Sequence, residues 1–142
     1  MADITASTAF RDFVASRLSS AGGVYYYATL HNSSGSAITA GQAYAASGIG
    51  ELATANGYTA GGKTAGTMTA TNGTLDCPDI QWDTGAGETL TCEYQALWVS
   101  TAATLTTAAK LVMLKNSSQT GAGAGGYVKM AMTNNIVIPT PA

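Results

Sequence analysis

The chain has little charge. Asp, Glu, Lys and Arg make up 10% of its 142 residues, whereas an average soluble domain holds about 25%. The six basic residues are scattered, and the net charge is −2. A protein that binds nucleic acid through its phosphates needs a basic stripe or patch. The composition therefore predicts that nucleic acid is not a partner.

Long apolar runs are missing as well. No stretch of about 18 apolar residues occurs, so the sequence predicts no transmembrane helix and no membrane partner. The first residues, "MADITASTAFRDFVASRL", lack both the basic start and the continuous apolar stretch of a secretion signal. We therefore expect a protein that is made and assembled in a cytoplasm.

Residues that bind metals or react readily are scarce. The chain has two cysteines, Cys77 and Cys92, and one histidine, His31. Two thiols and a distant imidazole do not form a zinc set, so we expect neither a metal nor a cofactor. The cysteines are interpreted as two small, reduced core residues. A disulfide across a hairpin, with its turn at Thr84-Gly85, remains the alternative.

Short β-rich runs, separated by turns of Gly, Asn and Ser, dominate the sequence. Residues 24–31 and 89–100 are the clearest strands, and Asn72-Gly73 is a hairpin signal. The glycine-rich stretch before Tyr127 is expected to be a hairpin tip. This pattern predicts a mainly β fold, an antiparallel β-sandwich or a jelly-roll-like barrel, for residues 24–142. Period-two spacing places five residues of the later strand on one face: Leu90, Cys92, Tyr94, Ala96 and Trp98.

One helix is predicted, near the N-terminus. Four apolar residues of the segment 5–20 recur at helical spacing: Phe10, Phe13, Val14 and Leu18. We interpret residues 1–23 as an amphipathic helical arm whose apolar face packs either on the domain's own sheet or, as an interface, on a neighbouring subunit. Tyr26, which lies on the opposite face of its strand from Tyr25 and Tyr27, is a further candidate interface residue.

The segment Gly57–Thr64, "GYTAGGKT", matches the phosphate-binding pattern G-x-x-x-x-G-K-[ST]. A true phosphate loop follows a buried strand and opens a helix, and its magnesium ion needs an Asp at the end of another apolar strand. The residues before Gly57 are not strand-like, and those after Thr64 do not predict a helix. We interpret the segment as a tight connection between β segments.

No other group of residues forms a recognisable catalytic set. Asp76, Asp79 and Asp83 have the wrong spacing for a calcium loop and are interpreted as solvated turn carboxylates. His31 has no partner at a recognisable spacing, so a structural or loop role is favoured over catalysis. The sequence thus predicts no catalytic residues, no cofactor-binding residues and no enzyme.

Three features carry a resemblance. Residues 51–65, "ELATANGYTAGGKTA", residues 80–99, "IQWDTGAGETLTCEYQALWV", and the glycine-rich stretch before a terminal strand together resemble small structural proteins of tailed bacteriophages. The matching residues are Glu51, Leu52, Gly57, Tyr58, Gly61, Gly62, Thr64, Trp82, Ala96, Leu97 and Trp98. The resemblance implies a β-rich virion component without catalytic residues.

Within that family, a capsid decoration, or cement, protein is favoured. It would lie on the outer capsid surface as a homotrimer and clamp adjacent capsomers, so its partners would be the major capsid protein and copies of itself. The alternative is a tail, fibre or knob component that contacts host surface glycans. In that case the aromatic platform would come from Tyr25, Tyr26, Tyr27, Trp82 and Trp98.

Overall fold

A computed structural model describes residues 23–39, 42–44, 48–71, 74–132 and 136–137. The predicted N-terminal helix, with Phe10, Phe13, Val14 and Leu18, lies outside the described residues. The described part is mainly β, as predicted, and its sheets are antiparallel. Its strands are β1 (Tyr25–His31), β2 (Lys63–Thr64), β3 (Thr69–Thr71), β4 (Thr74–Asp76), β5 (Ile80–Asp83), β6 (Thr89–Ser100), β7 (Lys110–Ala122), β8 (Tyr127–Met130) and β9 (Ile136–Val137).

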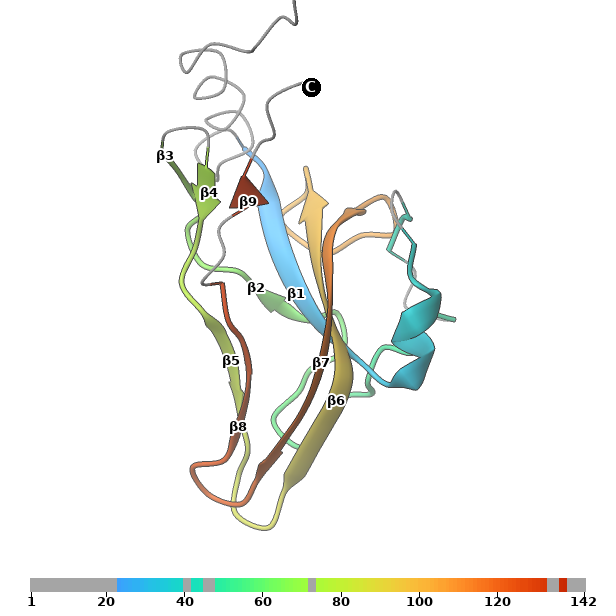
Figure 1. Cartoon of the computed structure of the whole chain (residues 1–142), viewed down its shortest axis with the longest axis vertical. Helices are drawn as coiled ribbons and strands as arrows, with labels where there is room; N and C mark the ends of the chain where they lie inside the picture. Colours follow the sequence, from blue (N-terminus) through green and yellow to red (C-terminus); the bar gives the residue numbers. More distant parts are fainter. Residues whose placement is uncertain (1–22, 40–41, 45–47, 72–73, 133–135, 138–142) are drawn as a thin grey trace, which may run out of the picture.

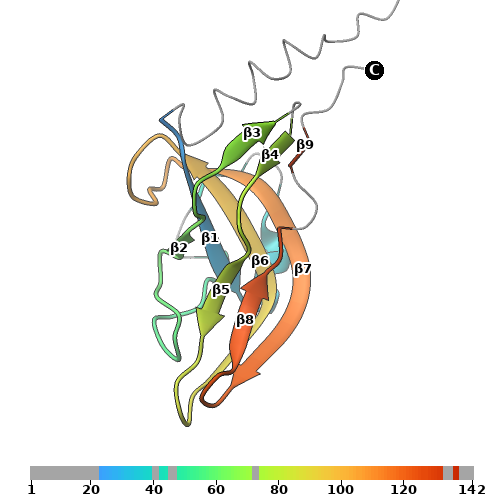
Figure 2. The ribbon, with the colours of Figure 1, turned by 90° about the vertical axis from the view of Figure 1, so that its left-hand side faces the viewer.

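The strands form one large sheet and two small ones. The large sheet has the order β2-β1-β6-β7, and the small sheets are β5-β8 and β3-β4-β9. Figure 1 shows β5 and β8 standing apart from β1, β6 and β7, and in the view of Figure 2 they cross in front of the large sheet. Apolar side chains from both β5 and the large sheet belong to the main core, which therefore lies between these layers.

The side chains of β1 follow the alternation expected of a strand. Its side chains alternate, so Tyr26, Ala28 and Leu30 enter the main core, as period two requires. Tyr26 is 3% exposed, and burial raises the pKa of its phenol to about 12. The proposed interface role of Tyr26 is therefore corrected: its side chain is a core residue of this chain and does not lie on its surface.

The prediction that alternate residues of β6 from Leu90 to Trp98 all lie on one face of the strand is wrong. Leu90 and Cys92 enter the main core, whereas Ala96 and Trp98 belong to a second core on the other side of the sheet. The change of face coincides with a shift in the β6–β7 register between Cys92 and Tyr94. An irregularity of this kind interrupts the period-two alternation, which a count along the sequence cannot detect.

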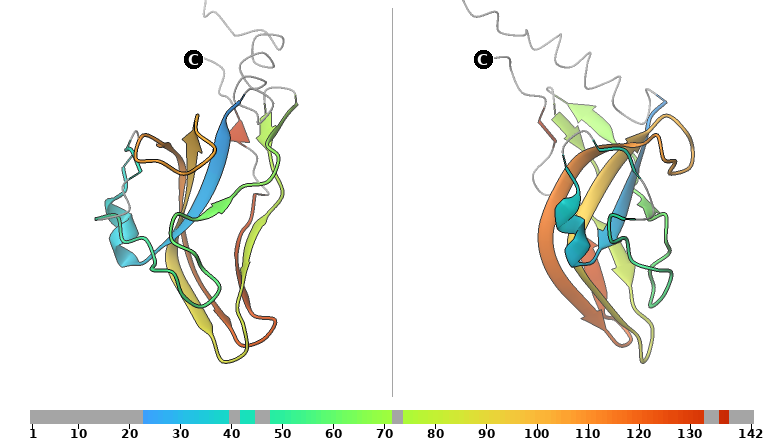
Figure 3. Two further views of the ribbon diagram at one scale, coloured as in Figure 1. Left: turned by 180° about the vertical axis from the view of Figure 1, so that it is seen from behind. Right: turned by 90° about the vertical axis from the view of Figure 1, so that its right-hand side faces the viewer.

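The second core covers the opposite face of the large sheet. Trp98 is its centre, with Ile38, Tyr44 and Ile49 packed around it. These residues come from the long connection after β1, which contains the 3₁₀ helix η2 (Ser33–Ala37). Figure 3 shows this helix, in teal, against the large sheet on the side away from β5 and β8. Within the described ranges, no helix is long and apolar enough to cross a membrane.

Two turns meet at the tip where β5 leads to β6 and β7 leads to β8 (Figure 1). The alternative hairpin that would bring Cys77 and Cys92 together does not form, because β5 pairs with β8 and β6 pairs with β7. The amide of Thr84 donates to Gly126 O (2.9 Å), and that of Gly123 donates to Glu88 O (2.8 Å). Both cysteines are free and buried, and burial raises the pKa of the Cys77 thiol to about 11.

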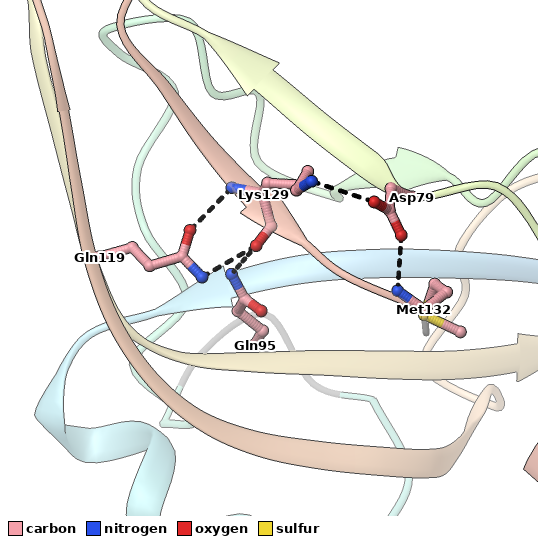
Figure 4. Close-up of polar contacts among 5 residues, drawn as sticks. All are labelled: Asp79, Gln95, Gln119, Lys129 and Met132. Atoms are coloured by element: carbon pink, nitrogen blue, oxygen red, sulfur yellow. Dashed lines mark hydrogen bonds and ion pairs between the residues drawn. The ribbon is translucent and has the colours of Figure 1, made fainter. Parts of the chain in front are cut away.

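A side-chain amide joins the two layers above this tip. Gln119 of β7 accepts from the backbone N–H of Lys129 with Oε1 (2.9 Å) and donates to its carbonyl with Nε2 (2.9 Å), as Figure 4 shows. Gln95 Nε2 donates to the same carbonyl (3.1 Å). Gln119 thereby replaces a neighbouring strand at the edge of β8, which satisfies backbone groups that would otherwise be costly to bury.

Candidate functional site

The segment Gly57–Thr64 folds as two successive turns and the start of a strand. Ala55 and Tyr58 exchange backbone hydrogen bonds (3.0 and 2.9 Å) around Asn56 and Gly57. These two central residues have φ of 54° and 86°, the left-handed conformation of a tight hairpin turn. A second turn is closed by Gly62 N–H donating to Thr59 O, and β2 follows. The interpretation as a connection between β segments is confirmed, and the described residues 65–71 after the loop contain no helix.

The carboxylate of Glu51 lies inside this loop. Its Oε1 accepts from the backbone N–H of Gly61 (2.7 Å) and from the hydroxyl of Tyr58 (2.7 Å), and its Oε2 accepts from Tyr44 (2.5 Å). A phosphate loop reserves such glycine N–H groups for its ligand. Here the chain's own carboxylate occupies that N–H, so the segment is not arranged as a phosphate loop.

Both tyrosines at this carboxylate are held in their neutral form. Burial raises the pKa of Tyr58, and its hydrogen bond to Glu51 raises it further. The same two causes, in the same order, raise the pKa of Tyr44. Each phenol therefore stays a donor to Glu51 throughout the physiological range. Because Tyr44 also packs edge-on against Trp98 (5.4 Å between ring centroids), Glu51 connects the loop to the second core.

His31 belongs to a buried chain of hydrogen bonds next to Glu51. Trp98 Nε1 donates to Thr29 Oγ1 (2.7 Å), and Thr29 Oγ1 lies 2.6 Å from His31 Nε2. The other ring nitrogen, Nδ1, lies 3.0 Å from Ile49 O. Since a carbonyl can only accept, the network assigns the proton to Nδ1 and lets Nε2 accept from Thr29. Burial lowers the pKa of His31, so the imidazole is a neutral structural residue.

A polar pocket opens beside the loop, between the edges of two sheets. It has a volume of about 350 Å³ and is lined by Gly57, Thr59, Gly62, Lys63, Trp82 and Asp83. Lys63 lies on β2 and Trp82 on β5. The ammonium group of Lys63 donates to Gln81 O (2.8 Å), which joins the two edges. Four of the eight residues of the segment Gly57–Thr64 thus line a pocket, although the segment does not have the geometry of a phosphate loop.

The three aspartates do not gather at one place. Asp79 Oδ2 forms an ion pair with Lys129 (3.1 Å), and its Oδ1 accepts from Met132 N (2.8 Å), as drawn in Figure 4. That backbone hydrogen bond, followed by the contact with Lys129, lowers the pKa of Asp79. Asp83 lies at the pocket, and Asp76 ends β4. Among the residues the structure describes, no three His, Cys, Asp or Glu side chains are arranged to hold a metal.

The structure also locates the aromatic residues of the glycan hypothesis. Tyr26, Tyr27, Trp82 and Trp98 are all buried, each at most 7% exposed. Tyr25 is 40% exposed, but one tyrosine is not a stacking platform. The five aromatics therefore do not form the surface platform that the sequence suggested, because Tyr26 and Trp82 enter the main core and Trp98 enters the second one.

No protein-family model, curated protein or solved structure matches this chain. The resemblance to phage structural proteins therefore rests on the sequence pattern alone. Several residues of that pattern nevertheless have a shared structural role: Glu51, Tyr58 and Gly61 meet in one hydrogen-bonded group. Sequence reasoning did not foresee this group, since its members are joined by a turn geometry and not by a fixed spacing.

Proposed function

We propose that this chain is a structural protein of a tailed-bacteriophage particle, a decoration protein that binds the outer capsid surface and clamps adjacent capsomers. It would act as a homotrimer on the major capsid protein. The N-terminal arm would reach a neighbouring subunit through Phe10, Phe13, Val14 and Leu18. The β body, built as a sandwich, would supply a second contact surface.

The observation that carries this proposal is the outer edge of β7. This strand has 13 residues and pairs with β6 along one side. Its first residues are covered on the other side, where Leu111 N–H donates to Gln42 O. From Val112 to Ser118, no strand of the described part pairs with that side. An edge with which no described strand pairs offers backbone donors and acceptors to another chain, and this supports a role in a particle of many chains.

The use of polar side chains agrees with a structural role. Glu51, His31, Gln119 and Asp79 each bind a backbone group of the same chain. They tie loops and strands together, which suits a protein that must keep its shape on a particle. The low charge also favours an extended protein contact, since few ions need to be desolvated.

The proposal is tested by mixing purified protein with capsids that lack it and counting bound copies by quantitative mass spectrometry. A decoration protein should bind in hundreds of copies and raise the temperature at which the capsid releases its DNA. A variant with Asn116→Lys and Ser118→Lys, two exposed residues of β7, should bind at least about tenfold more weakly, because lysines protect a strand edge.

The matched control adds the same charge elsewhere. Thr107→Lys with Ala108→Lys places two lysines on an exposed connection between β6 and β7, and this variant should bind like the original protein. If both variants lost capsid binding to the same extent, the cause would be the added charge in general. The β7 edge would then not be the binding surface. Failure of the original protein to bind capsids would refute the decoration role.

The second candidate, a tail, fibre or knob component that contacts glycans, keeps one supporting observation. This observation is the polar pocket between β2 and β5. The proposed aromatic platform no longer supports the role, because four of its five residues are buried. Copy number separates the two roles: a dozen or fewer copies per particle, located on the tail by electron microscopy, would favour the second.

A further inference from the structure

We infer that the pocket between β2 and β5, lined by Lys63, Trp82 and Asp83, binds a neutral, hydroxyl-rich ligand of about the size of one sugar ring. This site is independent of the β7 edge and goes beyond the decoration role. The site includes residues of the segment Gly57–Thr64, whose sequence matches a nucleotide-binding pattern.

The strongest evidence is the indole of Trp82. This side chain is 3% exposed, and buried indoles normally find an acceptor for their N–H. Trp98 follows that rule through Thr29, whereas the described structure gives Trp82 Nε1 no acceptor. Two buried side-chain atoms of the described residues lack partners, Tyr27 Oη and Gln95 Oε1, and Trp82 Nε1 is not one of them. Its N–H therefore keeps some contact with solvent, and Trp82 is one of the residues that line the pocket.

The remaining polar groups supply both donors and acceptors. Lys63 Nζ uses one of its three protons for Gln81 O, which leaves two for a ligand. Asp83 Oδ1 accepts from Gln81 Nε2 (2.5 Å), and its Oδ2 has no partner within the described ranges. Gln81 thus holds both charged groups in place from one position on β5, which reduces the ordering cost of binding.

The charges at the pocket indicate a neutral ligand. Lys63 and Asp83 carry opposite charges that cancel, and they form no ion pair with each other, since the described residues contain one, Lys129–Asp79. A phosphate would meet the attraction of Lys63 together with the repulsion of Asp83. A sugar ring carries several hydroxyls, which can accept from Lys63 and Trp82 and donate to Asp83, so one ring can satisfy all three groups.

The size of the pocket limits the ligand. Its volume of about 350 Å³ is at the lower end of the range for ligand sites, about 300–1,000 Å³. A ligand of roughly a dozen heavy atoms is expected to bind with a Kd of about 1 mM. Such weak binding becomes useful when many copies act together on one particle, because multivalency raises the overall affinity.

The two tryptophans make the test direct. In a ¹H–¹⁵N spectrum of the full chain, each indole N–H gives one signal, and Trp98 is an internal control because its N–H is already bonded to Thr29. A panel of neutral hexoses, N-acetylhexosamines and deoxyhexoses is titrated, with inorganic phosphate and ATP as anionic probes. We expect at least one neutral sugar to shift the Trp82 signal saturably while the Trp98 signal stays in place.

Variants then connect the shift to the pocket. Lys63→Met and Asp83→Asn alter exposed side chains and should each raise the Kd at least about tenfold, with the spectrum otherwise retained. Lys110→Met and Asp76→Asn are the matched controls and should leave the Kd unchanged. Capsid binding is measured on the same variants, and the two proposals are separable because these changes should not reduce it.

Three results would overturn the inference. The first is the absence of any Trp82 shift with the neutral panel at concentrations about 50-fold above the expected Kd. The second is a shift produced by phosphate or ATP and not by sugars, which would make the site an anion site. The third is a sugar-induced shift that persists in both Lys63→Met and Asp83→Asn, because the ligand would then lie elsewhere.

Discussion

The carboxylate of Glu51 accepts a hydrogen bond from the backbone N–H of Gly61 at 2.7 Å. This contact gives the glycine-rich loop an internal anion. With the hydroxyls of Tyr44 and Tyr58 on the same carboxylate, it joins the loop, the connection after β1 and both cores into one unit. A glycine N–H that a phosphate loop would offer to its ligand is therefore bonded to a carboxylate of the same chain.

Removing this carboxylate should loosen the loop. Glu51→Ala leaves Gly61 N–H and two phenols without their acceptor, and we expect a loss of about 2–4 kcal/mol in the free energy of unfolding. Urea denaturation followed by tryptophan fluorescence measures it. Glu93→Ala changes an exposed carboxylate of β6 and should cost less than about 0.5 kcal/mol. A small effect of Glu51→Ala would mean that the three contacts are not formed in solution.

The two neighbouring glycines of the loop should respond differently to alanine. Both have positive φ, 93° at Gly61 and 74° at Gly62, so each substitution carries a conformational cost of about 1–2 kcal/mol. A Cβ at Gly61 meets nothing within 4 Å, whereas a Cβ at Gly62 would lie 2.3 Å from Ala28 O. Gly62→Ala should therefore be the more damaging by at least about 2 kcal/mol, as measured by thermal unfolding. Equal effects would contradict the close packing of Gly62 on β1.

Stability should depend on the titration of His31. Burial lowers the pKa of His31 in the folded chain below 6.5, its ordinary value. The unfolded chain then binds more protons between the two pKa values, so the free energy of unfolding falls as the pH drops below 6.5, by up to about 1.4 kcal/mol per pH unit. Above pH 6.5 this contribution is fully present. Glu51, which favours the charged imidazole, reduces the effect without reversing it.

Urea denaturation at several values between pH 7.5 and pH 5 tests this dependence. His31→Gln should show a flatter profile than the original chain, even if it is less stable at every pH. Identical slopes in the two proteins would show that His31 does not carry the dependence.

The amide of Gln119 offers a test of how the layers are joined. Gln119→Leu removes both hydrogen bonds to the backbone of Lys129 and should cost about 1–3 kcal/mol. Gln119→Glu keeps an acceptor for Lys129 N–H but replaces the donor to its carbonyl with a second oxygen, so it should cost nearly as much. Ser118→Ala, an exposed position on the same strand, is the control. Hydrogen exchange of the Lys129 amide should accelerate in the two Gln119 variants and not in the control.

Much of the fold could be predicted from the residues themselves. The β-rich runs 24–31 and 89–100 became β1 and β6, and Thr71 pairs with Thr74 across the Asn72-Gly73 position. Local geometry is sufficient for such predictions, because side-chain alternation and turn preferences act within a few residues. The same reasoning correctly interpreted Gly57–Thr64 as a connection, since neither a strand before it nor a helix after it was encoded.

The arrangement of the strands was decided only in three dimensions. Nothing near Cys92 in the sequence shows that the β6–β7 register shifts there and sends Cys92 and Trp98 into different cores. β5 pairs with β8, about fifty residues away, and not with the adjacent β6, because long-range packing determines which edges meet.

The sequence by itself determined the strands, the turns and the scarcity of charge, which are local or compositional properties. The tertiary structure decided which polar groups find partners. The Gly61 N–H is bonded to Glu51 and Trp98 Nε1 to Thr29, and Trp82, Lys63 and Asp83 line one pocket. A hydrogen bond depends on distance and direction within fractions of an ångström, and only the folded chain sets these.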